Sequence, residues 1–276
     1  MNERIATARS FLFVPGHRPD RFAKAEAGGA DVVVLDLEDA VGAGHKDAAR
    51  GHVHEWLAAG HRAAVRINAP GTPWFEDDLA TAGAAAAVMV PKAEDAAGLA
   101  EVARSLPAGA ALVPLLETAA GIAGAAAVCA VPGVVRAAFG SVDLAAQLGV
   151  DHTSHTALRY ARSAVVLAAA ATGRPAPIDG VTTALDDSAV LEADLAEAVT
   201  LGFSAKLCLH PRQIAAVHEG FSPSEEDLRW ARAILAAVSD GSVSVHEGQM
   251  IDRPVGLRAQ GILARAGEHR QVSGGD

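Results

Sequence analysis

The stretch Leu112-Val-Pro-Leu-Leu-Glu117-Thr-Ala-Ala-Gly121 shows the pattern that decides the fold: an apolar run ends in a carboxylate and passes into small, helix-compatible residues. The stretch Phe139-Gly-Ser-Val-Asp143-Leu follows a second apolar run and places Asp143 at the start of a helical pattern. Each carboxylate therefore falls where a buried strand gives way to a loop or helix. Parallel α/β folds bind their ligands at this edge of the sheet.

The two carboxylates together predict a magnesium site. On its own, either residue is more simply explained as an acidic residue favoured at the start of a helix. Two of them on adjacent strand ends suit Mg²⁺, because this ion keeps several waters and takes only one or two carboxylates. We therefore expect Glu117 and Asp143 to act as a pair.

Apolar segments recur along the chain without period-2 alternation, and helical patterns follow them, which indicates a parallel sheet buried on both faces. The clear strand segments are residues 10–14, 31–37, 63–67, 86–90, 111–116, 134–138 and 204–209. An eighth strand is expected near residues 176–178. The predicted fold is a (β/α)₈ TIM barrel. A doubly wound open sheet is the alternative, disfavoured because no Gly-x-Gly-x-x-Gly fingerprint follows the first strand.

The C-terminal part of the chain continues beyond the eight expected units. An amphipathic helix is predicted over residues 224–238, and a second helix ends near Ala266. The segment is either a packing appendage or a lid over an active site.

Composition excludes several classes of function. The net charge is −10 without a Lys/Arg run, so no nucleic-acid or anionic-membrane partner is expected. Cys129 and Cys208 lack metal-type spacing and are expected to be buried thiols in a reducing cytosol. No signal-peptide pattern occurs, and the alanine-rich run at residues 164–171 is too short to span a bilayer. A cytoplasmic globular protein is predicted.

Ionisable side chains gather at the ends of the predicted strands. They are Arg18, Asp36, Glu38, Asp39, Arg66, Lys92, Glu117, Asp143 and His210. One interpretation is a ring of salt bridges, for instance Arg66 with Asp36 and Lys92 with Glu94. The other is functional: an arginine beside two acidic metal ligands can hold a substrate carboxylate in a two-pronged grip. Lys92 can also form a Schiff base, whereas His210 is expected to cap its strand.

Eight motifs then occur in an order that resembles a known family. They are Phe13-Val-Pro-Gly-His-Arg-Pro-Asp-Arg-Phe-Ala-Lys-Ala, Val34-Leu-Asp-Leu-Glu-Asp-Ala-Val, Val65-Arg-Ile-Asn, Val90-Pro-Lys-Ala-Glu, Leu116-Glu-Thr-Ala-Ala-Gly, Phe139-Gly-Ser-Val-Asp-Leu, Leu209-His-Pro-Arg-Gln-Ile and Glu247-Gly-Gln-Met-Ile-Asp. From about Ser10 to Arg258 the chain resembles the citrate lyase β-subunit-like family of acyl-CoA lyases, within the malyl-CoA lyase and HpcH/HpaI aldolase group.

The resemblance implies roles for residues at matching positions. Glu117 and Asp143 would bind Mg²⁺, or Mn²⁺ in its place, and Glu117 would also lie against the substrate. Arg66 would hold the carboxylate of a 2-oxo acid, and Arg18 and Lys24 would lie on the path of coenzyme A. The three acidic residues of the second motif would surround the metal ligands and order metal-bound water; they are Asp36, Glu38 and Asp39.

The resemblance also gives the C-terminal segment a role. Asp252 would be the acid/base residue, carried on a lid from a neighbouring subunit of a homotrimer. We therefore expect residues 1–222 to form the catalytic barrel. Residues 223–276 would form C-terminal helices and a lid segment that packs on the neighbouring subunit.

The implied reaction is cleavage of a 3-hydroxyacyl-CoA, such as citramalyl-CoA or malyl-CoA, to acetyl-CoA and a 2-oxo acid. Three alternatives stay open within the same fold: a citrate lyase β subunit that cleaves a citryl thioester on a carrier protein, a malyl-CoA thioesterase, and a non-catalytic barrel that serves as a scaffold. A Schiff-base aldolase that uses Lys92 is a fourth.

Overall fold

The computed structural model describes residues 2–237, 244–246, 249–251 and 253–266, and the chain forms two compact units, Met1–His218 and Glu219–Asp276. The sequence placed the domain boundary between residues 222 and 223. Within the described residues, no helix has both the length and the apolar character needed to cross a bilayer.

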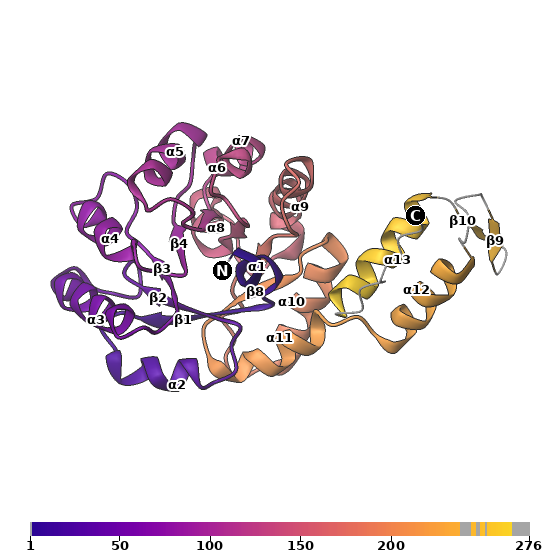
Figure 1. The fold of residues 1–276 in the computed structure, drawn as a ribbon, viewed down its shortest axis with the longest axis horizontal. Coiled ribbons are helices and arrows are strands. Elements are labelled where there is room, and N and C mark those ends of the chain that lie inside the picture. Colours follow the sequence, from indigo (N-terminus) through magenta and orange to yellow (C-terminus); the bar gives the residue numbers. More distant parts are fainter. Residues whose placement is uncertain (1, 238–243, 247–248, 252, 267–276) are drawn as a thin grey trace, which may run out of the picture. The chain divides into compact units, whose positions relative to one another are not determined.

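The first unit is a closed barrel of eight parallel strands that pair in chain order, so the predicted (β/α)₈ fold is confirmed (Figure 1). The strands are β1 (Ser10–Pro15), β2 (Val32–Asp36), β3 (Ala64–Arg66), β4 (Ala87–Val90), β5 (Leu112–Leu116), β6 (Ala138–Phe139), β7 (Ile178–Asp179) and β8 (Ala205–Cys208). The barrel closes because β1 pairs with both β2 and β8.

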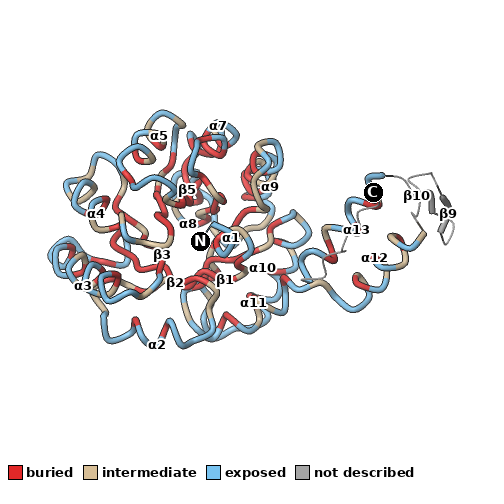
Figure 2. Tube along the Cα trace, in the orientation of Figure 1, coloured by how far each residue is buried: buried red, intermediate tan, exposed pale blue. Residues whose placement is uncertain are grey.

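Helices surround the barrel, and Figure 2 shows that burial follows the strands and the inward faces of these helices. They are α1 (Asn2–Thr7), α2 (Phe22–Glu26), α3 (Lys46–Ala58), α4 (Phe75–Ala82), α5 (Ala96–Ser105), α6 (Ala119–Ala123), α7 (Ala125–Ala130), α8 (Ser141–Leu148), α9 (His155–Ala171) and α10 (Ser188–Leu201), with α11 (Ile214–Gly220) after β8. Alternate strand residues such as Phe11, Met89 and Leu207 fill the barrel interior. The residues between them face the helices, which explains the continuous apolar runs.

The second unit has a small core of its own. Helices α12 (Glu225–Ala237) and α13 (Arg253–Arg265) pack through Leu228, Ala231, Ile234, Ala259 and Ile262. Strands β9 (Ser244–His246) and β10 (Gln249–Ile251) pair antiparallel. The packing of this unit on a neighbouring subunit stays a prediction.

Two parts of the barrel differ from the sequence-based expectation. Strand β6 was expected at residues 134–138 but covers Ala138–Phe139, and Val134 forms only an isolated bridge to Leu112. Between them, Arg136 directs its buried guanidinium to the carbonyl oxygens of Ala8 and Ala176, each at 2.6 Å. The 17-residue helix α9 was not predicted, because its alanine-rich sequence gives little contrast between polar and apolar positions.

Candidate metal and substrate site

The ionisable residues of the predicted site lie at the carboxyl ends of consecutive strands. Asp36 and Arg66 are the last residues of β2 and β3. Lys92 and Glu117 follow β4 and β5, and Asp143 lies in the first turn of α8, after β6. Because parallel strands end at one edge of the barrel, residues far apart in the chain meet there.

Arg66 is held by two acidic residues from β2 and the loop after it. Its Nε and Nη2 donate to the two carboxylate oxygens of Asp36 at 2.8 and 2.6 Å, and Nη1 lies 3.0 Å from Glu38 Oε2. The Phe13 ring lies under the guanidinium, 4.6 Å from its carbon. The Arg66–Asp36 salt bridge considered from the sequence is therefore present. Asp36 uses two of the five N–H donors of an arginine, so the guanidinium retains donors for a ligand.

Lys92 connects the acidic residues of the site. Its Nζ lies 2.7 Å from Glu38 Oε1 and 3.2 Å from Asp143 Oδ2. The alternative pairing with Glu94 is not formed in the described part of the chain. Burial lowers the pKa of Lys92, but the hydrogen bond to Glu38 and the charges of Glu38 and Glu117 outweigh this effect and raise it. A Schiff-base lysine needs a neutral amine, so this environment argues against that role.

Glu117 is buried, with 4% of its surface exposed. Its Oε1 accepts a hydrogen bond from the backbone amide of Lys92 at 2.9 Å. A Cβ on Gly140 would lie only 2.5 Å from both Cβ and Oε2 of Glu117, so the glycine makes room for the carboxylate. Burial, followed by the charges of Glu38 and Asp143, raises the pKa of Glu117 to about 8.

These residues fit a divalent cation that prefers oxygen ligands. Glu117 and Asp143 supply carboxylate oxygens, and the raised pKa of Glu117 shows that a positive charge beside it would be favourable. Within the described residues, no three His, Cys, Asp or Glu side chains form a complete ligand set. Two carboxylates completed by water and substrate oxygens are the arrangement that Mg²⁺ accepts.

Other predicted residues form no ion pair with this group within the described part of the chain, although the charge of Asp39 acts on Lys92. Arg18 pairs with Asp20 in its own turn, at 2.9 and 2.7 Å. Lys24 on α2 and Asp39 beside Glu38 are exposed. Asp252 lies outside the described residues, so its role as the acid/base residue stays a prediction.

His210 caps the short helix that follows its strand, and not the strand itself as the sequence suggested. Its Nδ1 accepts a hydrogen bond at 3.1 Å from the backbone amide of Arg212, at the start of the 3₁₀ helix Pro211–Gln213.

Sequence reasoning missed a supporting network beneath the site. Lys46 is buried and donates to the carbonyl oxygens of Leu37 and Glu38 and to Asn68 Oδ1, at 2.6, 2.8 and 2.7 Å. This ties the loop after β2 to the end of β3. The sequence did contain an indication of this role. A lysine at the first position of a helix, as at Lys46, interacts unfavourably with the helix dipole, so another interaction must stabilise it there.

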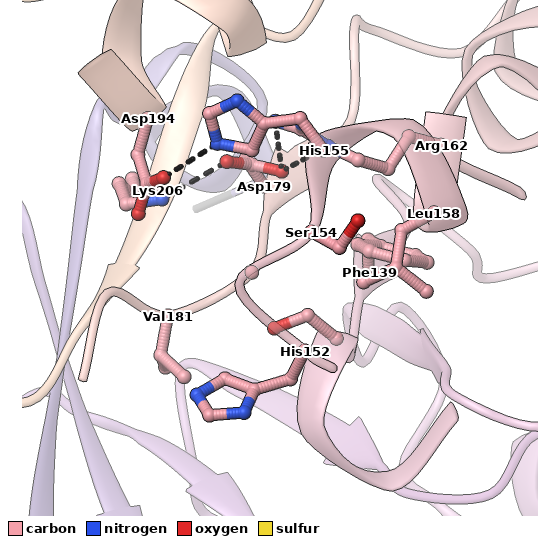
Figure 3. Close-up of a pocket in the computed structure, with 12 residues that line it drawn as sticks. Phe139, His152, Ser154, His155, Leu158, Arg162, Asp179, Val181, Asp194 and Lys206 are labelled. Atoms are coloured by element: carbon pink, nitrogen blue, oxygen red, sulfur yellow. Dashed lines mark hydrogen bonds and ion pairs between the residues drawn. The ribbon is translucent and has the colours of Figure 1, made fainter. Parts of the chain in front are cut away.

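A second group of charges lies between the barrel wall and the helices, and the sequence did not indicate it. Asp179 binds Arg162 and Lys206, each at 2.9 Å, while His155 lies 2.7 Å from Asp194 (Figure 3). The cavity beside them measures about 30 Å³, which is room for about one or two waters. The charges in this cluster pair with one another, so we interpret it as a structural link between strands and helices.

Comparison with known proteins identifies the family. Residues 9–211 match the model described as HpcH/HpaI aldolase/citrate lyase. The chain belongs to this family. It is 42% identical over 277 residues to a citrate lyase subunit beta-like protein of Mycobacterium tuberculosis, covering 97% of this chain and 98% of the relative. The resemblance found in the sequence is therefore confirmed.

Family members differ in what they bind and do. A (3S)-malyl-CoA thioesterase of Cereibacter sphaeroides is 33% identical over 269 residues, covering 94% of each chain. Among solved structures, the protein CitE of Mycobacterium tuberculosis in complex with magnesium, acetoacetate and coenzyme A superposes with a TM-score of 0.83 at 38% identity. That match covers 95% of this chain and 99% of the other.

Proposed function

We propose that the protein is a Mg²⁺-dependent lyase that cleaves a 3-hydroxyacyl-CoA, such as citramalyl-CoA or malyl-CoA, to acetyl-CoA and a 2-oxo acid. The observation that carries this proposal is the chain of ion pairs Arg66–Glu38–Lys92–Asp143 beside the buried Glu117. It brings metal-type carboxylates and a guanidinium to one edge of the barrel. The related CitE structure that holds magnesium, acetoacetate and coenzyme A supports the same ligand classes.

Each residue would have a distinct task. Glu117 and Asp143 would hold Mg²⁺, and the chemistry that the ion supplies in such a site is stabilisation of negative charge on oxygen. Arg66 would bind the substrate carboxylate with the donors that Asp36 leaves unused, and Asp36 would fix its orientation. The half-buried Arg18, after β1, and the exposed Lys24, on α2, are cations that suit the phosphates of coenzyme A.

Cleavage transfers the electron pair of the broken C–C bond to the acetyl carbon, while the hydroxyl proton passes to solvent and the hydroxyl oxygen becomes the carbonyl oxygen of the 2-oxo acid. We propose Asp252 as the acid that protonates the acetyl carbon; in the reverse direction it would remove that proton. This role, the lid and the homotrimer rest on the sequence resemblance alone.

The test is acetyl-CoA release from citramalyl-CoA, malyl-CoA and 3-hydroxy-3-methylglutaryl-CoA, with Mg²⁺ or with EDTA. Wild type should cleave one of these esters in a metal-dependent way. Glu117→Ala should lose the activity, whereas Glu94→Gln, which changes an exposed carboxylate nearby, should keep it. Absence of acetyl-CoA and 2-oxo acid from every ester would contradict the proposal.

A thioesterase is the second candidate, because malyl-CoA thioesterases are among the relatives. The same assay separates the two reactions. Free CoA with malate, and without acetyl-CoA, would indicate hydrolysis of the thioester. Activity confined to a citryl thioester on a carrier protein would instead indicate the reaction of a citrate lyase β subunit.

A further inference from the structure

Lys92 has an unusual backbone conformation at the centre of the site. Its φ of 49° makes it the one non-glycine residue with a positive φ among the described residues. This left-handed region is unfavourable for side chains with a Cβ, and such strain is concentrated at functional sites. The conformation lets Lys92 contact three carboxylates, because its amide donates to Glu117 while its Nζ lies against Glu38 and Asp143.

The formal charges of the site show what Lys92 contributes. The carboxylates in contact with Lys92 or Arg66 number four, at Asp36, Glu38, Glu117 and Asp143, against these two cations. The charges of Asp39 and Lys46, which also act on this group, cancel each other in the count. With all four ionised, the group carries two net negative charges, which a divalent cation neutralises. Without Lys92 the group would carry three, and it would keep one negative charge after the cation binds.

We propose that Lys92 is a charge-balancing residue of the metal site, which weakens divalent-cation binding at Glu117 and Asp143 and strengthens binding of the substrate anion. This inference rests on the proposed metal site. It gives a role to Lys92, which has no part in the proposed cleavage step. The ammonium lies 3.2 Å from Asp143 Oδ2, so a cation held by this carboxylate would lie close to it, and two positive charges repel. A substrate carboxylate then meets a neutral site instead of a negative one.

The two effects have opposite signs, which separates this role from a structural one. If Lys92 only held Glu38 and Asp143 in place, its removal would disorder the carboxylates and weaken both ligands. If it balances charge, its removal tightens binding of the metal and weakens binding of the anion. Methionine at position 92 retains the backbone amide bonded to Glu117 and nearly the length of the side chain, and it removes the charge together with the hydrogen bond from Nζ to Glu38 Oε1.

The experiment measures binding by titration calorimetry, without turnover. Mg²⁺ is titrated into Lys92→Met, Lys92→Arg and wild type, and pyruvate is then titrated at saturating Mg²⁺. Lys92→Met should bind Mg²⁺ at least about tenfold more tightly and pyruvate about tenfold more weakly. Lys92→Arg, which keeps the charge, should stay within about threefold of wild type for both ligands. Arg104→Met removes an exposed charge from α5 and should change neither constant.

Three results would overturn the inference: weaker Mg²⁺ binding by Lys92→Met, unchanged binding of either ligand, or no Mg²⁺ binding by wild type. Lys92→Gln replaces Lys92→Met if the thermal unfolding curve shows that the methionine variant does not fold. Failure of the lyase proposal alone would give a different set of results. Wild type would then bind Mg²⁺ and pyruvate with the expected dependence on Lys92, yet cleave no CoA ester.

Discussion

Glu117→Gln is expected to stabilise the protein above about pH 6 when divalent metal is removed with EDTA. Burial, with the charges of Glu38 and Asp143, raises the pKa of the Glu117 carboxyl from 4.5 to about 8. Between these two values the folded state binds more protons than the unfolded state. The free energy of unfolding therefore falls as the pH rises through this window. Glutamine keeps an oxygen for the Lys92 amide but cannot ionise.

The size of the effect follows from the pKa shift. One pKa unit corresponds to about 1.4 kcal/mol. Between pH 5 and pH 7 Glu117 ionises in the unfolded chain but stays largely protonated in the folded protein, so the stability of wild type should fall by about 2 kcal/mol. The variant lacks this loss, so the difference in stability between the two proteins should grow with pH and vanish below pH 4.5, where both side chains are neutral.

The assay is urea unfolding in EDTA at pH 5, 6, 7 and 8. Glu94→Gln, which removes an exposed carboxylate, should follow the pH dependence of wild type. Saturating Mg²⁺ should stabilise wild type but not Glu117→Gln, because only wild type retains both carboxylates of the proposed metal site. Parallel stability curves for wild type and Glu117→Gln would refute the claim that folding forces this carboxyl into an unfavourable environment.

Three further substitutions test the geometry. Gly140→Ala places a methyl group about 2.5 Å from Glu117 Cβ and Oε2, so it should displace the carboxylate and lower the Mg²⁺ affinity about 10–100-fold, as measured by calorimetry. Arg66→Lys cannot reproduce the two bonds to Asp36 and should lower kcat/KM for the cleaved ester roughly 100-fold; near-normal kinetics would show that the two-pronged contact is dispensable. Lys46→Met leaves three buried acceptors without their donor and should lower the free energy of unfolding by roughly 2–4 kcal/mol, measured in urea.

Most of the fold could be predicted, because a parallel barrel strand is buried on both faces. The run at residues 31–37 predicted β2, which covers Val32–Asp36. Strand β6 was misplaced because hydrophobicity alone does not show that Arg136 interrupts the run with a buried guanidinium. Helix α9 was not predicted because alanine occurs on both the buried and the exposed faces of a helix, so its sequence shows little amphipathic pattern.

The sequence predicted which edge of the barrel would carry the charges, since the carboxyl ends of parallel strands meet there. It could not predict the pairing among them. Lys92 pairs with Glu38 and Asp143 from a left-handed backbone conformation, which nothing in the segment Val90-Pro-Lys-Ala-Glu indicates. The requirement for glycine at position 140 likewise depends on how closely β5 and β6 approach, and this is a property of the folded barrel.

Hydrogen bonding explains why neighbouring carboxylates of one site would have different roles. Asp36 accepts two bonds from Arg66 and one each from the backbone amides of Glu38 and Ala40. A carboxylate has about four lone-pair positions, so Asp36 is saturated and suited to hold an arginine in place. Glu117 accepts one such bond within the described residues, from the Lys92 amide, although it is nearly as deeply buried. Its unfilled capacity makes Glu117, and not Asp36, the carboxylate that a cation would stabilise.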